Sequence, residues 1–478
     1  MRILNSICTL SLCLLFAAGL FANNLQISSV NLSNDSTITF NISWENSWRV
    51  SVVPQNHDAS WIFIKKRDCA SGQWSHVDLS STLSDHTAAT PLEVYLDGKD
   101  VSAEAKGLFL RRSTDGVGNI INVAVSVRIK NLGPADYDFK VYGIEMVQIP
   151  QDSFYLGDGN GGGTYRNGSS TAPYYVTSEN AIAVANTVGK LYTASSTNFR
   201  PVSLPAAFPK GYAEIYSMKY EITQGQYVDF FNSLNADQAP IRYMNVTTNR
   251  HNISGVWPVV TNTLPHRAMG FLGWADYLAF LDWSALRPMT DLEFEKICRG
   301  PIYPVKSELA WGTTLYTRAA TLISDGTPNE SVTDMITPGS GIASIGGATG
   351  GVQGSLRSGF AAKTATSRLE AGATYYGVME MTGNVYEQVI STTTTTGVAF
   401  TGMVGDGEIS TTPSPGYANV PFWPSKTAST VATSGAVGKA LRGGGWAGAL
   451  STGGISNRTY ATYHFATRIN TMGGRGVR

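Results

Sequence analysis

Apolar and polar residues alternate in the N-terminal part of the chain. One alternating series is Ile38, Phe40, Ile42 and Trp44, and another is Ile121, Val123, Val125, Val127 and Ile129. A period of two is the pattern of a strand that buries one face. Two short apolar runs, Trp61 to Ile64 and Leu108 to Leu110, lie between the two series, where no helical period occurs. We therefore predict a small antiparallel β-sandwich over residues 23–145.

Helical patterns first appear beyond residue 146. Two pairs match the capping box, Thr223 with Gln226 and Thr290 with Glu293, in which side chains satisfy free backbone groups at a helix start. Between these pairs, an apolar stretch predicts a helix over Trp274 to Trp283. The helix that starts at Thr290 should end near Gly300. We interpret the acidic residues Asp291, Glu293 and Glu295 as helix-start charges with packing partners rather than as acid–base catalysts.

Composition adds a division into two parts. A chain of 478 residues is longer than one hydrophobic core usually serves, so we expect a second domain over residues 146–478. The 42% of apolar residues suits a packed protein, while 50 glycines and only 15% charged residues indicate many loops and turns. The 35 basic and 35 acidic residues cancel, which argues against nucleic acid as a partner.

Residues 1–22 have the pattern of a secretory signal peptide. Arg2 precedes an apolar run from Leu10 to Phe21, and Ala22 provides a small residue for cleavage. The run is shorter than the ~20 residues of a membrane span, and no later stretch reaches that length. We expect an exported protein, located in the periplasm, at the cell surface or outside the cell. Cys69 and Cys298 are its only remaining cysteines, and we expect two separate buried thiols rather than a disulfide.

Several sequence blocks occur in a defined order after residue 144. They read MVQIPQDSFYLG from Met146, EITQGQYVDF from Glu221, RPMTDLEFEKICRG from Arg287, YYGVMEMTGNVYEQV from Tyr375 and LRGGGWAG from Leu441. This order resembles the formylglycine-generating enzyme, or sulfatase-modifying factor, family over about residues 144–478. The resemblance implies a C-type-lectin-like domain low in regular secondary structure. With the predicted sandwich, the expected fold class is α+β.

The catalytic groups of that family are missing from this chain. Its enzymes oxidise a substrate cysteine to formylglycine, and they use a pair of cysteines after the Gly-Trp block to bind copper(I). Here the corresponding stretch runs from Ala447 to Thr452, and no cysteine follows Cys298. Since copper(I) requires soft thiolate ligands, we expect no formylglycine-generating activity. The six histidines show no helical metal-binding spacing, so we recognise no iron site of the kind found in another branch of the family.

A calcium site is implied by the resemblance around the MEMTGNVYE block. The ligand positions correspond to Glu380, Gly383, Val385 and Glu387, with carboxylates from the two glutamates and backbone carbonyls from the other two. Calcium accepts such mixed oxygen ligands in irregular geometry. The alternative is that Glu387 only forms hydrogen bonds that hold the turn.

The C-terminal segment is where the family usually contacts its ligands. For Arg442, Trp446 and Arg478 we favour a structural role in the core. For Tyr460, Tyr463 and His464 we consider ligand binding, because aromatic side chains are common at recognition surfaces. The leading hypothesis is a non-catalytic binding or structural module, a pseudoenzyme, with a protein or glycan ligand. The alternatives are a metal-dependent oxidoreductase with an unrecognised centre, and a component of a gliding or secretion machinery.

Overall fold

The computed structural model describes residues 24–34, 36–161, 163–194, 199–347, 351–363, 365, 367–424 and 435–478. The expected signal peptide, residues 1–22, lies outside these ranges. Within them, no helix is both long and apolar enough to cross a membrane.

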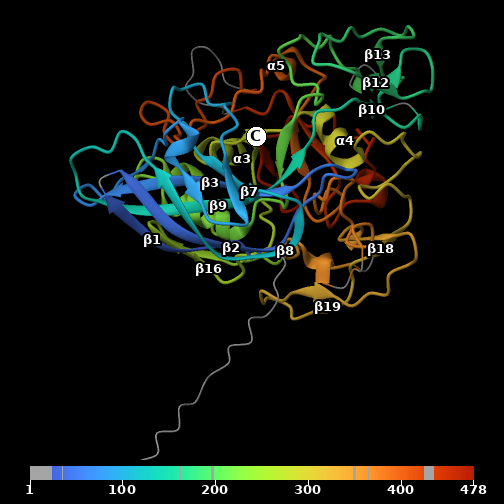
Figure 1. Ribbon diagram of the computed structural model, residues 1–478. Coiled ribbons are helices and arrows are strands. Elements are labelled where there is room, and N and C mark those ends of the chain that lie inside the picture. The colour runs from blue at the N-terminus through green and yellow to red at the C-terminus, as the bar shows by residue number, and fades with distance from the viewer. Residues whose placement is uncertain are drawn as a thin grey trace, which may run out of the picture.

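The fold is rich in β-structure, and its sheets are mainly antiparallel (Figure 1). A four-stranded sheet has the order β1 (Gln26–Asn34), β2 (Thr37–Arg49), β8 (Gly116–Arg128), β5 (Thr87–Ala88). An eight-stranded sheet has the order β17 (Arg287–Pro288), β24 (Gly476–Val477), β14 (Ile215–Met218), β9 (Tyr137–Ile149), β3 (Asp58–Asp68), β7 (Leu108–Arg112), β6 (Leu92–Tyr95), with β4 (Trp74–His76) beside β3.

The remaining strands form short pairs. The antiparallel ones are β10 (Phe154–Leu156) with β12 (Tyr174–Val176), β11 (Arg166–Asn167) with β13 (Leu191–Tyr192), β15 (Ile253–Val256) with β16 (Val259–Asn262), β19 (Leu322–Ile323) with β20 (Ser331–Val332), and β22 (Glu387–Ile390) with β23 (Lys439–Arg442). The pair of β18 (Tyr316–Arg318) and β21 (Gly341–Ala343) is parallel. These short pairs and the loops between them agree with the many loops and turns that the composition indicates.

The two large sheets share an apolar core between β2 and β8 on one side and β3, β7 and β9 on the other. The predicted series Ile38 to Trp44 is buried as expected. The second series is wrong at its first position, because Ile121 is 75% exposed and Ile120 is buried instead. Asn122 has a positive φ of 49°, and the β2–β8 register shifts between Ile42 and Trp44. Such a bulge moves the alternation by one residue.

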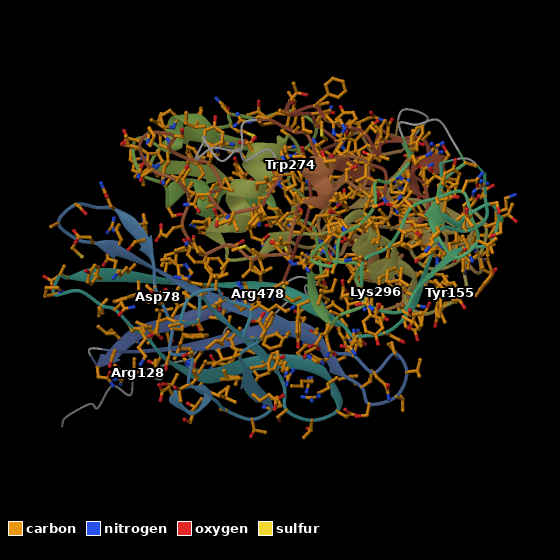
Figure 2. The ribbon with its side chains drawn as sticks, turned by 90° about the horizontal axis from the view of Figure 1, so that it is seen from above. Asp78, Arg128, Tyr155, Trp274, Lys296 and Arg478 are labelled. Atoms are coloured by element: carbon orange, nitrogen blue, oxygen red, sulfur yellow. The ribbon has the colours of Figure 1, made fainter. Side chains whose placement is uncertain are left out.

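The larger sheet continues across residue 145, where we placed the domain boundary. β9 runs through this position without a break, and it pairs with β3 along one edge and with β14 over Met146–Ile149. The C-terminal residue reaches back into the N-terminal part, where the Arg478 guanidinium pairs with Asp97 at 2.8 Å and Asp100 at 2.7 Å. In Figure 2, Arg478 lies where the N-terminal strands meet the rest of the molecule. The two parts therefore share one sheet.

The helices begin and end where their capping residues predict. α1 (Gln224–Asn232) follows a capping box at Thr223, and α4 (Asp291–Arg299) follows one at Thr290 and ends at Gly300. α3 spans Trp274–Trp283 as expected and is buried almost all round. Two short helices are α2 (Ala239–Arg242) and α5 (Thr395–Val398).

Both cysteines are free, and they differ in exposure. Cys298, at the end of α4, is buried as predicted. The prediction of a buried thiol is wrong for Cys69, which is exposed because it follows β3 in a turn at the end of the sheet.

Candidate ligand-binding site

Two cavities flank the loop that follows β23. The first, here called the polar cavity, has a volume of about 540 Å³. Its lining combines residues of this loop with distant segments: Asp158, Asn160, Gly163, Thr164, Phe199, Ser307, Leu309, Thr314, Leu450, Ser451, Gly454, Ser456, Asn457, Arg458 and Thr459. The second, here called the tyrosine cavity, has a volume of about 230 Å³. Its lining combines aromatic and aliphatic side chains with polar groups: Tyr386, Leu441, Ala447, Gly448, Tyr460, Tyr463, Ile469, Thr471 and Met472.

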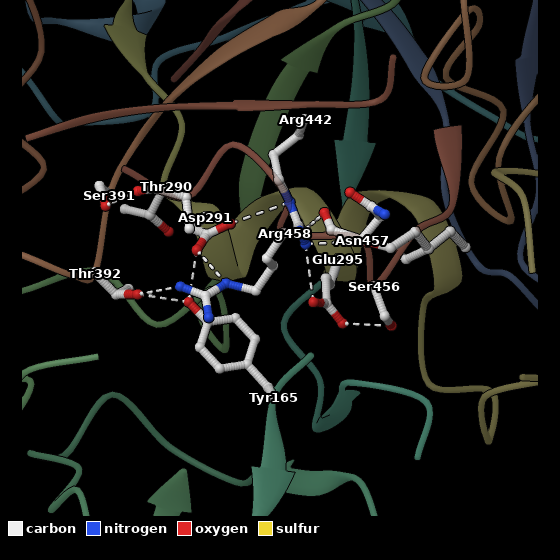
Figure 3. Close-up of polar contacts among 12 residues, drawn as sticks. Tyr165, Thr290, Asp291, Glu295, Ser391, Thr392, Arg442, Ser456, Asn457 and Arg458 are labelled. Atoms are coloured by element: carbon white, nitrogen blue, oxygen red, sulfur yellow. Dashed lines mark hydrogen bonds and ion pairs between the residues drawn. The ribbon is translucent and has the colours of Figure 1, made fainter. Parts of the chain in front are cut away.

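A network of buried charges lies beneath the polar cavity (Figure 3). The Arg442 guanidinium pairs with Asp291 at 3.1 Å and with Glu295 at 2.8 Å, and Arg458 pairs with Asp291 at 3.0 Å. The Tyr165 hydroxyl donates to Asp291 at 2.6 Å, and its ring lies 3.9 Å from the Arg458 guanidinium. Burial raises the pKa of Asp291, but Arg442 and Arg458 outweigh it and hold this pKa below its ordinary value.

The acidic residues on α4 have the packing partners that we expected from the sequence. Glu293 accepts two hydrogen bonds from Arg287 and one from the backbone of Thr290. Glu295 accepts from Arg442 and Arg299. Buried carboxylates that are paired with guanidiniums in this way help to hold the fold.

The walls of the polar cavity carry hydroxyl and amide groups with little free charge. Asp158 is held by two backbone groups, since it accepts from the Asn160 backbone N–H in its own loop at 2.9 Å and from the Ser307 backbone N–H of a distant segment at 2.8 Å. Leu450 and Ser451, from the stretch after Trp446, also line it. Such a lining suits a ligand with many hydrogen-bonding groups.

The tyrosine cavity brings together two of the three predicted ligand-binding residues. Tyr460 lies edge-on to Tyr386 with ring centres 5.5 Å apart, and to Tyr463 at 5.7 Å. His464 is not among the residues that line either cavity. It faces the backbone of Ala436 and Lys439, and burial lowers its pKa. Sequence reasoning missed Tyr386 as a wall residue, and its place in the GNVYE block was the only available signal.

Lys439 is a further residue of this region that sequence reasoning missed. Its Nζ donates to the Phe465 carbonyl at 3.1 Å, contacts the Met472 sulfur at 3.3 Å and lies 5.3 Å from the Tyr463 ring centre. It pairs with no carboxylate of the described residues. Burial lowers its pKa to about 7. This lysine fixes the backbone that carries Tyr463.

The four predicted calcium ligands lie close to this loop. Glu380 Oε1 accepts from the Gly359 amide at 2.9 Å, and Glu387 Oε1 accepts from Arg475 at 2.6 Å. The second oxygen of each carboxylate is buried and accepts no hydrogen bond from the described residues. Burial raises the pKa of Glu380 to about 7, and it raises that of Glu387 despite Arg475.

The backbone of this block joins it to the loop that follows β23, here called the ligand loop. The Gly383 amide donates to Gly443 at 2.8 Å, and the Trp446 amide donates to Asn384 at 2.8 Å. Within the described part of the chain, the carbonyls of Gly383 and Val385 accept no hydrogen bond. No group of three or more His, Cys, Asp or Glu side chains in that part is placed to hold a metal ion.

Comparison with known proteins adds little to this geometry. No family model matches the chain, and no curated protein does. Among solved structures, Treponema denticola variable protein 1 is similar with a TM-score of 0.32 and 14% identity, over 70% of this chain and 95% of that one. A similarity of this size supports no conclusion about the present chain.

Proposed function

We propose that this protein is an exported, non-catalytic binding module that combines an N-terminal β-sandwich with a domain like that of the formylglycine-generating enzymes. The ligand, a protein or a glycan, binds at the loop between Trp446 and Tyr463. The domain has sequence blocks that resemble those of that family. Its ligand loop has no pair of cysteines, and two cavities lie beside it.

The observation that carries the proposal is the lining of the polar cavity. The resemblance places the thiolates in the stretch from Ala447 to Thr452, which has no cysteine. Leu450 and Ser451 of this stretch line the cavity, and neither side chain can bind copper(I). Cys298 is fully buried in α4, where burial raises the pKa of its thiol well above the ordinary value. Such a thiol is inert. Cys69 lies at the end of β3 and does not line the cavity.

An activity assay tests the non-catalytic part of this proposal. The purified protein, loaded with copper(I) and supplied with oxygen, should leave the cysteine of a sulfatase-type peptide unchanged in mass. The proposal would be wrong if the peptide cysteine lost mass in the presence of copper and the Cys298→Ser variant did not cause this loss. The protein would then be an enzyme. Metal analysis of the protein as isolated is a second check, since stoichiometric copper or iron would also favour an enzyme.

A binding assay tests the location of the site. Ser451→Trp places a large ring in the polar cavity at an exposed position, so it should abolish binding of any glycan or peptide that an array identifies. Ser81→Trp, at an exposed position of the N-terminal part, is the matched control and should bind as the parent does. Equal binding by both variants would rule out this cavity as the ligand site.

Calcium is the cofactor we propose for the MEMTGNVYE block. Two buried carboxylate oxygens without hydrogen bonds, on Glu380 and Glu387, together with the free carbonyls of Gly383 and Val385, support it. These are hard oxygen donors with excess negative charge, as calcium requires. A bound ion would stabilise the block that supports Tyr386 and the ligand loop.

A further inference from the structure

One edge of β9 is open over part of its length. β9 pairs with β3 from Tyr137 onward, but its other edge pairs with β14 only over Met146–Ile149. The last hydrogen bond on that edge runs from the Lys219 amide to the Glu145 carbonyl at 2.9 Å. Beyond this point β14 ends and the chain turns away toward α1.

The ladder shows which backbone groups face the open edge. In an antiparallel sheet, alternate residues direct their N–H and C=O groups to opposite neighbours. The Gln148 amide donates to His57 on the β3 side, while the Glu145 carbonyl faces β14. By this alternation, the N–H and C=O groups of Gly143 and Val141 face away from β3, and no described residue pairs with them there.

A groove of about 310 Å³ lies along this edge. Val141, Gly143 and their neighbours on β9 form one wall, and α1 forms the other through Gln226 and Asp229. The ion pair between Lys140 and Asp229, 2.6 Å long, joins the two walls. Gly143 is half-buried, and the Leu25 and Ile27 side chains occupy the space where its own side chain would lie.

The Glu145 end of the groove has excess negative charge. Glu145 and Asp58 share the single ammonium of Lys219, at 3.1 Å and 3.9 Å. The Oε1 atom of Glu145 is buried and accepts no hydrogen bond from any described residue. Since Lys219 cannot neutralise both carboxylates, this end favours a basic side chain from a partner.

We propose that the groove binds an extended peptide segment, which adds as a strand to the open edge of β9 and places a lysine or arginine near Glu145. Strand addition uses main-chain hydrogen bonds for affinity and alternate side chains for specificity. On one face the added strand meets Leu25 and Ile27, and on the other it meets the aromatic wall of Phe280 and Trp283. This site is separate from the two cavities of the ligand loop.

The test uses the full mature chain and capped hexapeptides that alternate Val with Thr and carry one central lysine. Hydrogen exchange should show the amides of Val141 and Gly143 becoming protected when peptide is added. N-methylation of the peptide amides that face β9 should weaken binding about tenfold for each hydrogen bond removed, while methylation of the other amides should not. These comparisons need no change to the protein.

A paired substitution tests the charge. Norleucine in place of the lysine should weaken binding to the parent about tenfold but leave binding to Glu145→Gln unchanged. The proposal is overturned if no peptide of the set binds at about 1 mM, or if methylated and unmethylated peptides bind equally. It is also overturned if Val141 and Gly143 are already protected in a concentration-dependent dimer, which would assign the edge to a second copy of the chain.

Discussion

The N-terminal strands and the C-terminal loops satisfy their buried backbone groups in different ways. In the large sheets, ladders pair most of the N–H and C=O groups, and an apolar cluster fills much of the space between the sheets. Beyond α4, strands are short, and arginine side chains take over part of this role. Arg442 donates to the Ile455 carbonyl at 3.0 Å, and Arg475 donates to the carbonyls of Met218 and Lys219 at 3.2 Å.

The comparison teaches what an irregular fold requires. A buried carbonyl without a partner is costly, and glycine-rich loops cannot form ladders. A guanidinium carries several donors in a fixed plane, so one arginine can bind a carboxylate and loop carbonyls together. The carboxylates of Asp291, Glu295 and Glu387 neutralise the charge that this brings into the core. Ion pairs and arginine hydrogen bonds therefore hold much of the ligand loop, whereas strand ladders and an apolar cluster hold much of the N-terminal part, beside buried polar groups such as Asp58.

Arg442→Ala should have the largest effect on stability. It leaves Glu295 and Asp291 short of a partner in the core, which should lower the free energy of unfolding by about 3–5 kcal/mol. Urea denaturation of the parent and the variant measures this. Arg67→Ala removes an exposed pair with Asp138 and is the matched control, with no measurable change expected. Similar effects in both variants would contradict the role of the buried network.

Ile42→Ala should cost about 2–5 kcal/mol, because it opens a cavity between the two large sheets. Ile121→Ala should change the free energy of unfolding by less than about 0.5 kcal/mol, since the bulge at Asn122 turns Ile121 to solvent. Denaturant titration of both variants distinguishes the observed register from regular alternation. A large loss with Ile121→Ala would contradict the bulge.

Glu380 should make the stability fall as the pH rises. Burial raises its pKa from 4.5 in the unfolded chain to about 7 in the folded protein. Below pH 4.5 the Glu380 carboxyl is protonated in both the folded and the unfolded protein, so it does not lower the free energy of unfolding. Above pH 7 the carboxyl is ionised in both states, and its burial then lowers the free energy of unfolding by up to about 3 kcal/mol. Glu380→Gln should therefore gain stability relative to the parent between these pH values, as parallel melts would show.

Calcium should raise the melting temperature of the parent relative to chelator, because a ligand that binds only the folded state stabilises it. Glu380→Gln should lose most of this increment, whereas Glu104→Gln, remote from the site, should keep it. Equal melting temperatures of the parent with calcium and with chelator would exclude the site. Glu387→Ala is a poorer probe, since it also leaves the buried Arg475 without its carboxylate.

Thr290→Ala should lower the free energy of unfolding by about 1 kcal/mol, the smallest loss expected apart from the control variants, because it removes the hydroxyl that caps α4. Thermal unfolding should show a shift of similar size for Thr223→Ala, which removes the cap of α1. No shift in either variant would mean that tertiary packing alone fixes these helix starts.

The sequence by itself determined the features that depend on neighbouring residues. The bounds of α3 and the starts of α1 and α4 follow from local apolar spacing and capping pairs. The buried face of β2 follows from its alternation. Of the candidate ligand residues, Tyr460 and Tyr463 do lie together at a cavity. Local physical chemistry is sufficient in these cases, because each depends on contacts within a few residues along the chain.

Only the tertiary structure decided what depends on distant segments. The exposure of Ile121 and Cys69, the facing of His464 toward Lys439, and the continuation of the sheet past residue 145 were not readable from spacing. The partners of Asp291 come from residues 442 and 458, and the open edge of β9 exists because β14 ends early. Such contacts join residues far apart along the chain. Apolar periodicity does not show which distant segment will provide a charged partner or where a neighbouring strand will end.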